Sequence, residues 1–322
     1  PGEDEAEDLR VLAPLAPECL VPILDHAGQL SGLLVLGQRL SEEPYSSEDK
    51  RLLDSVASQA GIAIENFGLA EKMAERMEVD RRVARDMEIA REVQSRLFPQ
   101  FLPPLQTLQY TGACIQARVV GGDYYDFLDL GAGRLGIVLA DISGKGIAAA
   151  LLMANLQANL RSRYMVALED PHQLLQSVNR LFFENTPEDS YATLFYADYD
   201  DANHCLRYAN CGHNPPLLLR ANGEIERLGA TATVLGLFTN WNCEVKKVSL
   251  GPGDVLVIYT DGVTEAPNQA GEEFGESRLL KIVRAHKQVE VKETLSAILA
   301  EVQEFSGASQ ADDLTLVIAR AC

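Results

Sequence analysis

The 322-residue sequence has no long hydrophobic run: no stretch approaches the roughly 18 to 20 consecutive apolar residues that a membrane-spanning helix needs. Basic residues are few, 28 Lys and Arg against 47 Asp and Glu, which gives a net charge of −19 that repels nucleic-acid phosphates. The six cysteines are scattered and form no Cys-x-x-Cys pair, as is typical of reduced thiols. Five of the first eight residues are acidic, unlike a secretory signal. We therefore expect a cytoplasmic protein that binds neither membranes nor nucleic acids.

At 47% hydrophobic residues, the chain has enough apolar material for two domains, and its first segment is predicted over residues 1–66. Residues 21–24 and 30–36 read as strands, and a helix is expected to begin with Ser47 as its N-cap. Two strands and one helix bury little core, so this segment is expected to be part of a larger domain. Residues 33–37 and the helix that follows resemble the C-terminal half of a GAF domain, a sensory module. An unrelated α+β fragment is the alternative.

A helical linker is predicted over residues 67–98, which contain no proline and no glycine after Gly68. Alternating spacings of three and four residues place a partly polar stripe along it, and its members are Met73, Arg76, Asp80, Val83, Met87, Ala90, Gln94 and Leu97. One interpretation is a coiled coil that pairs two chains into a homodimer. The other is a helix packed on its own domain.

The third segment, residues 99–322, changes to many short strands with two pairs of helices. Strands are predicted at 108–116, 124–130, 135–141, 192–198, 205–209, 216–220, 244–250, 255–259 and 314–319. Helices are predicted at 147–163, 171–184, 276–286 and 291–305. Strand runs joined by turns, with helices in pairs, favour an α+β sandwich over alternating βαβ units.

Aspartates follow or precede glycine-rich turns at four strand ends of this segment: Asp123, Asp141, Asp261 and the Asp312–Asp313 pair. A carboxylate beside a core is costly unless it is paired, and several converging carboxylates repel one another unless a cation neutralises them. All-oxygen sites suit Mg²⁺ or Mn²⁺ better than Zn²⁺. We therefore expect a divalent-cation site. A zinc site built from His204, Cys205, Cys211 and His213 is rejected, because consecutive residues of a strand point to opposite faces.

The motifs of residues 85–320 resemble the SpoIIE/RsbU-like branch of the PPM (type 2C) metal-dependent serine/threonine phosphatases. The resemblance runs in order through residues 90–99, 120–126, 141–146, 149–153, 210–216, 253–256, 259–266 and 312–315. It implies a sandwich of two antiparallel sheets flanked by helices, with two Mn²⁺ or Mg²⁺ ions in each active site.

The same resemblance implies a role for each aspartate. Asp141 would bridge both cations, Asp123 and the carbonyl of Ile142 would complete one site, and Asp261 and Asp312 would hold the other cation. Asp313 is included among the candidate metal ligands, but the favoured role for it is to contact the ligands rather than the metal.

Two residues depart from the pattern of eukaryotic relatives. Ser143 stands where those relatives carry a histidine proposed as general acid, and Arg118 is an insecure counterpart of their phosphate-binding arginine. For Lys145, a solvated turn lysine is favoured over a catalytic one.

The resemblance implies a protein phosphatase that hydrolyses phosphoserine or phosphothreonine with a water activated by two metals. The expected substrate is a phosphorylated STAS-type anti-anti-sigma protein, and the N-terminal sensory segment is expected to regulate the reaction. Two alternatives stay open: a catalytically silent phosphatase fold that only binds partners, and a two-metal phosphoesterase that acts on small molecules.

Overall fold

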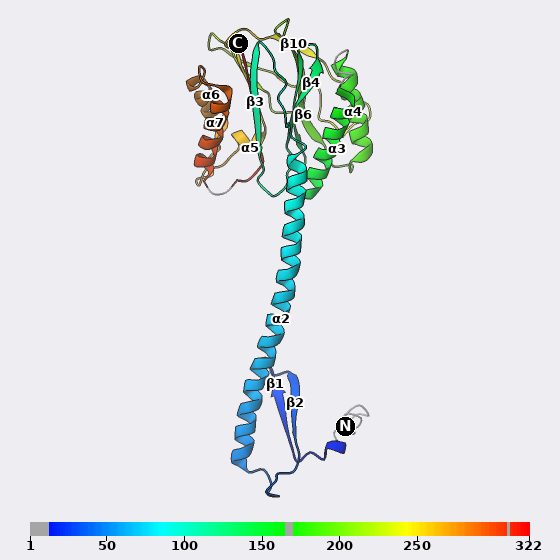
Figure 1. Ribbon diagram of the computed structural model, residues 1–322, viewed down its shortest axis with the longest axis vertical. Coiled ribbons are helices and arrows are strands. Elements are labelled where there is room, and N and C mark those ends of the chain that lie inside the picture. The colour runs from blue at the N-terminus through cyan, green and yellow to red at the C-terminus, as the bar shows by residue number, and fades with distance from the viewer. Residues whose placement is uncertain (1–12, 165–169, 308–309) are drawn as a thin grey trace. The chain divides into compact units, whose positions relative to one another are not determined.

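The computed structural model describes residues 13–164, 170–307 and 310–322, and it divides into two compact units between Arg85 and Asp86 (Figure 1). The division lies inside α2 (Ser47–Ser95), a single helix of 49 residues. The predicted domain boundaries at residues 66 and 98 lie within this helix and shortly after it, and both stay predictions. Among the described residues, no helix is long and apolar enough to cross a bilayer.

The first unit contains a short 3-10 turn, η1 (Ala13–Leu15), and an antiparallel hairpin of β1 (Cys19–Leu24) and β2 (Leu30–Leu36) beside the start of α2. The N-cap of α2 is Ser46, not Ser47 as predicted. The Asp49 amide donates to Ser46 Oγ at 3.2 Å, and the Ser46 amide donates to Asp49 Oδ2 at 2.8 Å. This reciprocal capping box fixes the helix start, and the sequence offers two adjacent serines that can supply it.

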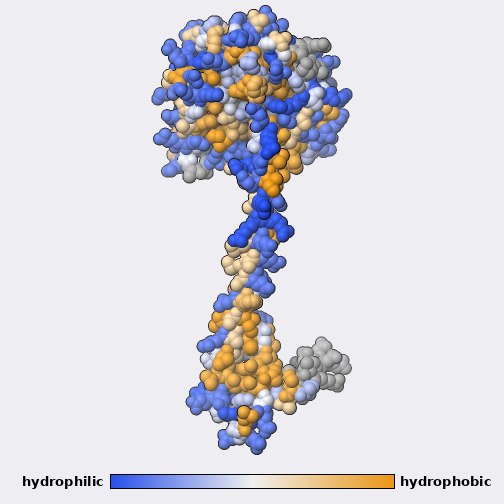
Figure 2. Space-filling model, viewed as in Figure 1, coloured by the Kyte–Doolittle hydropathy of each residue, from blue (hydrophilic) through white to orange (hydrophobic). Residues whose placement is uncertain are grey.

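The first unit leaves much apolar surface exposed. Figure 2 shows apolar side chains gathered over β1, β2 and the first half of α2, among them the exposed residues Leu20, Leu24, Leu30, Val56 and Phe67. A hairpin and one helix cannot enclose these side chains. That residues 1–66 form part of a larger sensory domain stays a prediction.

The C-terminal end of α2 departs from the predicted stripe. The helix ends at Ser95, so Leu97 lies beyond it and packs against the core of the second unit. Gln94 is 4% exposed and belongs to the same unit. The last two positions of the stripe therefore contact the chain's own domain, while Met73 and Val83 are exposed.

The second unit is a sandwich of two five-stranded antiparallel sheets, as predicted. The first sheet has the order β10-β7-β6-β5-β4, and the second has the order β3-β12-β11-β8-β9. The strands of the first sheet are β4 (Tyr124–Gly131), β5 (Arg134–Ile142), β6 (Ala192–Asp200), β7 (Cys205–Cys211) and β10 (Lys246–Ser249). Those of the second are β3 (Leu108–Ile115), β8 (Leu217–Leu219), β9 (Ile225–Arg227), β11 (Val255–Tyr259) and β12 (Leu314–Ala321). The three-residue strand β9 was not predicted.

Helices cover both outer faces of the sandwich. α3 (Ile147–Arg163) and α4 (Pro171–Asn185) pack on the first sheet, and α6 (Gly275–Ala285) and α7 (Val291–Ser306) pack on the second (Figure 1). These helices agree with the predicted ranges to within one or two residues. A further one-turn helix, α5 (Asp261–Thr264), was not predicted.

Candidate metal centre

The two sheets enclose a common apolar core, and the candidate site lies at one end of it. Side chains alternate along a strand, so residues two apart share a face. Asp123, Asp141, Thr193, Thr260 and Thr315 each stand two positions beyond a residue that packs in this inter-sheet core. Those core residues are Tyr125, Leu139, Phe195, Ile258 and Val317. Polar side chains from five strand ends of both sheets therefore meet where the apolar core ends.

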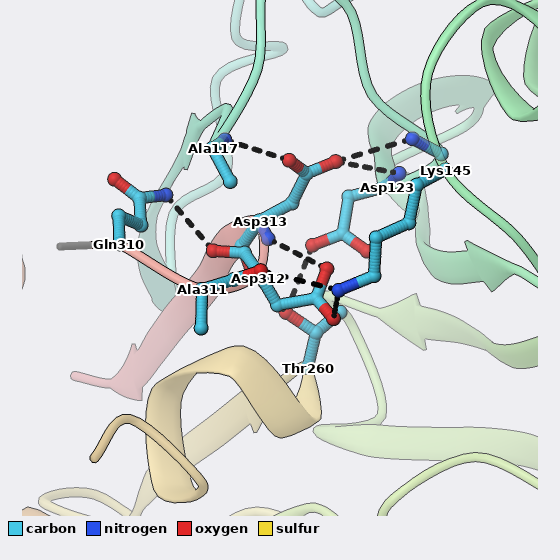
Figure 3. Close-up of polar contacts among 9 residues, drawn as sticks. Ala117, Asp123, Lys145, Thr260, Gln310, Ala311, Asp312 and Asp313 are labelled. Carbon is cyan, nitrogen blue, oxygen red and sulfur yellow. Dashed lines mark hydrogen bonds and ion pairs between the residues drawn. The ribbon is translucent and has the colours of Figure 1, made fainter.

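Asp123 is the most buried of the predicted carboxylate ligands, with 3% of its surface exposed. Its Oδ2 accepts a hydrogen bond from Thr260 Oγ1 at 2.9 Å (Figure 3). It also accepts one from Thr315 Oγ1 at 2.5 Å. Burial, followed by the charge of Asp141, raises the pKa of Asp123 well above its ordinary value. The two threonines fix Oδ2 in place, and neither was singled out from the sequence. The sequence signal that could have found them is their spacing: each lies two positions from an apolar residue of the inter-sheet core, Ile258 or Val317, and within two residues of Asp261 or Asp313.

The pKa values of Asp141 and Asp261 are both raised within this cluster. Burial, then the charges of Asp261 and Asp312, raise the pKa of Asp141 to about 7. Burial, then the charge of Asp312, raise the pKa of Asp261, the first residue of α5. Carboxylates with raised pKa values bind either a proton or a cation readily, because their ionised forms repel one another where little water reaches them.

Asp312 lies on the open side of the cluster, where Lys145 contacts it. Lys145 Nζ donates to Asp312 Oδ2 at 2.6 Å and to the Ala311 carbonyl at 3.1 Å (Figure 3). The preferred interpretation of Lys145 as a solvated turn lysine was therefore incomplete. Its side chain is 47% exposed but ion-paired with a predicted ligand.

Asp313 has a different set of partners from its neighbour. It is 8% exposed, and its carboxylate accepts hydrogen bonds from the backbone amides of Ala117 at 2.8 Å, Gly122 at 3.1 Å and Asp123 at 3.5 Å (Figure 3). Both oxygens are therefore engaged with the loop that carries Asp123. This arrangement favours a supporting role for Asp313, while its assignment as a metal ligand stays a prediction.

The predicted backbone ligand, the carbonyl of Ile142, lies next to Gly122, which has no side chain to crowd it. A Cβ at Gly122 would come within 3.0 Å of the Ile142 carbonyl oxygen, the predicted backbone ligand. The donor set of four carboxylates and this carbonyl consists only of oxygen atoms, which fits Mg²⁺ or Mn²⁺. In the described part of the chain, however, no three acidic, histidine or cysteine side chains converge closely enough to form a cation site. The assignment of individual ligands stays a prediction.

Positive charge lines the cleft beside these carboxylates. Arg118, Lys145 and Gly146 line it together with Asp141 and Asp312. A cleft with acidic groups and basic groups side by side suits a cation and a phosphoryl group at once. Arg118 thus lies at the site, and its correspondence to the phosphate-binding arginine of the eukaryotic relatives stays a prediction.

The last turn of α2 contacts the loop that carries Asp123. Gln94 Nε2 donates to the Gly121 carbonyl at 2.8 Å, and the Gly121 amide donates back to Gln94 Oε1 at 3.2 Å. Gln116 Nε2 also donates to Gln94 Oε1 at 2.6 Å. The sequence marked Gln94 only as a polar position of the helical stripe.

The sandwich with aspartates at its end defines the chain as a PP2C-type phosphatase fold. The solved PP2C domain of SiaA from Pseudomonas aeruginosa shares this fold with a TM-score of 0.67 and 21% sequence identity, over 75% of this chain and 98% of that one. The family model for Stage II sporulation protein E (SpoIIE) matches residues 131–321, so the chain belongs to the SpoIIE family. Asp141, Asp261 and Asp312 lie within this match, and Asp123 lies just before it. A GAF domain model matches residues 7–64, which confirms the predicted GAF resemblance.

Two curated relatives extend the comparison. Protein IcfG of Synechocystis sp. (strain ATCC 27184 / PCC 6803 / Kazusa) is 30% identical over 259 residues, which are 72% of this chain and 41% of that protein. Phosphoserine phosphatase RsbU of Bacillus subtilis (strain 168) is 25% identical over 299 residues, which are 92% of this chain and 88% of that protein. The chain thus spans less than half of IcfG and most of RsbU. The similarity to RsbU, a phosphoserine phosphatase, agrees with the prediction of a phosphatase.

Proposed function

We propose that the chain is a Mn²⁺- or Mg²⁺-dependent protein phosphatase that hydrolyses phosphoserine or phosphothreonine. The observation that carries the proposal is the arrangement around Asp123, whose carboxylate accepts hydrogen bonds from Thr260 and Thr315. Burial, and then the nearby charge of Asp141, raise the pKa of Asp123. The similarity to RsbU, which covers most of that phosphoserine phosphatase, supports the choice of reaction.

Each residue of the cluster has a defined task in this proposal. Asp141 would contact both cations, Asp123 and the Ile142 carbonyl one of them, and Asp261 and Asp312 the other. When bound, two such cations supply charge neutralisation and lower the pKa of the attacking water. Asp313 holds the amides of the Asp123 loop. Lys145 and Arg118 place positive charge beside the phosphoryl oxygens.

The proposed substrate is a phosphorylated STAS-domain protein, and phosphate release is the test. The full chain is assayed with a phosphoserine STAS protein and with an aryl phosphate, in Mn²⁺, in Mg²⁺ and in EDTA. We expect metal-dependent release from the protein substrate, and its loss in Asp141→Asn. Release from the aryl phosphate alone would instead favour a small-molecule phosphoesterase. No release from either substrate by protein that binds no Mn²⁺ would indicate a silent phosphatase fold.

We propose that α2 regulates the site through Gln94. Its amide side chain bonds both backbone groups of Gly121, two residues before Asp123, so a movement of the last turn of α2 would shift the Asp123 loop. In Gln94→Leu we expect Mn²⁺ affinity to fall several-fold, whereas Gln303→Leu, at an exposed position of α7, serves as the control. Unchanged Mn²⁺ affinity in Gln94→Leu would contradict this part of the proposal.

We also propose that the chain forms a homodimer through α2. Met73 and Val83, two members of the predicted stripe, are 65% and 55% exposed. Pairing with the same stripe of a second copy would remove this apolar surface from water. Sedimentation equilibrium should show a dimer for the full chain and a monomer for the double variant Met73→Glu, Val83→Glu. A wild-type monomer at micromolar concentration would contradict the pairing.

A further inference from the structure

The loop between β7 and β8 crosses from the first sheet to the second, and it carries a buried histidine. Gly212 has a positive φ of 69°, which turns the chain out of β7, and His213 follows with 5% of its surface exposed. The His213 amide donates to Asn210 Oδ1 at 2.8 Å, and Asn210 Nδ2 donates to the Leu228 carbonyl at 3.0 Å. These bonds hold the turn, so the position of the imidazole is defined by its own loop.

The imidazole bonds one element of each sheet. His213 Nε2 lies 3.1 Å from the Tyr259 carbonyl oxygen at the end of β11. A carbonyl only accepts, so Nε2 carries the proton, and Nδ1 then accepts from Thr193 Oγ1 of β6 at 2.8 Å. Burial lowers the pKa of His213 to about 4, which keeps the ring neutral near pH 7. Both nitrogens are thus occupied, and the ring acts as a spacer between the sheets.

Each of the two elements carries a predicted ligand next to the histidine contact. Thr193 is the direct cross-strand partner of Asp141 in the β5–β6 pair, so the two side chains are neighbours on the same face. Tyr259 lies two residues before Asp261 and is followed by Thr260, which donates to Asp123. One ring therefore joins the strand beside Asp141 to the turn that begins at Asp261.

We propose that His213 is a positioning residue that fixes the distance between the Asp141 strand and the Asp261 turn, and thereby the affinity of the site for divalent cations. This inference rests on the proposed function, since it takes these aspartates as the ligands. Replacing a residue that orients metal ligands without binding the metal typically lowers metal affinity or activity by about 10- to 100-fold. A histidine that only stabilises the core would change the melting temperature and leave cation affinity unchanged.

The test compares three variants of the full chain by calorimetric Mn²⁺ titration and by thermal unfolding in EDTA. His213→Leu removes both hydrogen bonds, and we expect the Mn²⁺ dissociation constant to rise about tenfold or more. His213→Gln retains one donor and one acceptor, and we expect it to recover most of the affinity. The matched control is Asn179→Leu. Asn179 is equally buried, and it bonds the Gly236 amide and the Phe238 carbonyl, on a segment without predicted ligands.

The inference is overturned if His213→Leu binds Mn²⁺ like the wild type, or if Asn179→Leu loses as much affinity at a similar loss of melting temperature. If His213→Leu does not fold, Thr193→Val and Thr193→Ser decide the question, because only the serine variant keeps the hydroxyl that donates to Nδ1. A tenfold loss in the valine variant alone supports the inference, and equal affinities overturn it. Phosphate release is not needed for these readouts, so a wild-type chain that binds Mn²⁺ but releases no phosphate would count against the proposed function alone.

Discussion

Thr260 and Asp123 adjoin strands of opposite sheets and are 137 residues apart in the sequence, and Thr260 Oγ1 donates to Asp123 Oδ2 at 2.9 Å. This hydrogen bond orients a carboxylate that burial alone would disfavour as an ion. We predict that Thr260→Val raises the concentration of Mn²⁺ needed for half-maximal phosphate release about tenfold. The physical reason is that Asp123 loses one of the two donors that hold its Oδ2. A Mn²⁺ titration of the initial rate measures the effect.

Thr260→Ser is the control for that experiment, because it keeps the hydroxyl and removes only a methyl group. It should need nearly the same Mn²⁺ concentration as the wild type. Equal Mn²⁺ requirements in the valine variant and the wild type would mean that Thr315, the second donor, holds Asp123 by itself.

Asp141→Asn is predicted to abolish phosphate release while leaving the fold intact. Asp141 is buried and is repelled by the charges of Asp261 and Asp312, so an amide there removes a predicted cation ligand and relieves repulsion. We expect activity to fall by at least about a hundredfold. Asp129→Asn is the matched control, since Asp129 is an exposed residue of β4 whose Oδ1 accepts from the Gly131 amide. Activity above a tenth of the wild-type value in Asp141→Asn would contradict the central role of Asp141.

The raised pKa of Asp141 predicts a pH dependence of stability in the metal-free protein. The folded-state pKa is about 7 against an ordinary value of 3.8, so between these values the folded chain binds a proton that the unfolded chain has lost. Stability that depends on this group therefore falls as the pH rises from about 4 to about 7. His213, with its lowered pKa, contributes the opposite slope below its ordinary value of 6.5. The difference in unfolding free energy between the wild type and Asp141→Asn cancels the contribution of His213, because both proteins contain it.

In EDTA, Asp141→Asn should exceed the wild type in unfolding free energy by more at pH 8 than at pH 5.5. The widening should be about 1 to 2 kcal/mol, since each pKa unit corresponds to about 1.4 kcal/mol. Urea unfolding at both pH values measures it. A gap that stays constant or narrows would show that Asp141 is not perturbed in the folded chain.

Much of the fold follows from local sequence. Val255–Tyr259 is a continuous apolar run, and its bounds were predicted to the residue because a buried strand has this composition. The helices α3, α4, α6 and α7 were also predicted, to within one residue at each end. β9 and α5 were not, because three or four residues carry too little periodicity. The cap of α2 was wrong by one residue, since Ser46 and Ser47 are equivalent by type.

The candidate site was only partly visible in the sequence. The aspartates stood out because carboxylates beside apolar strands are unusual, but the donors that orient them belong to the pairing of the two sheets. Nothing in the local sequence distinguishes Thr260, which follows β11, or Thr315, which lies in β12, until the pairing of these strands places both beside Asp123. The reach of Gln94 to Gly121 likewise depends on where α2 ends, which the heptad pattern placed too late.

The last prediction concerns the close approach of the Asp123 loop to Asp313. A Cβ built on Gly121 would lie 1.9 Å from Asp313 Oδ2, which is far inside any permitted contact. Gly121→Ala must therefore displace the carboxylate that holds the amides of Gly122 and Asp123. We expect Mn²⁺ affinity to fall about tenfold or more, with a loss of roughly 1 to 3 kcal/mol in unfolding free energy as buried hydrogen bonds break.

Gly229→Ala is the matched control, because nothing lies within 4 Å of the Cβ that this change would add, and Gly229 has no positive φ. It should bind Mn²⁺ and unfold like the wild type. If Gly121→Ala also behaved like the wild type in both measurements, the Asp313 carboxylate could move aside without loss of unfolding free energy or Mn²⁺ affinity. The contact between Asp313 and the Asp123 loop would then not be what shapes the site.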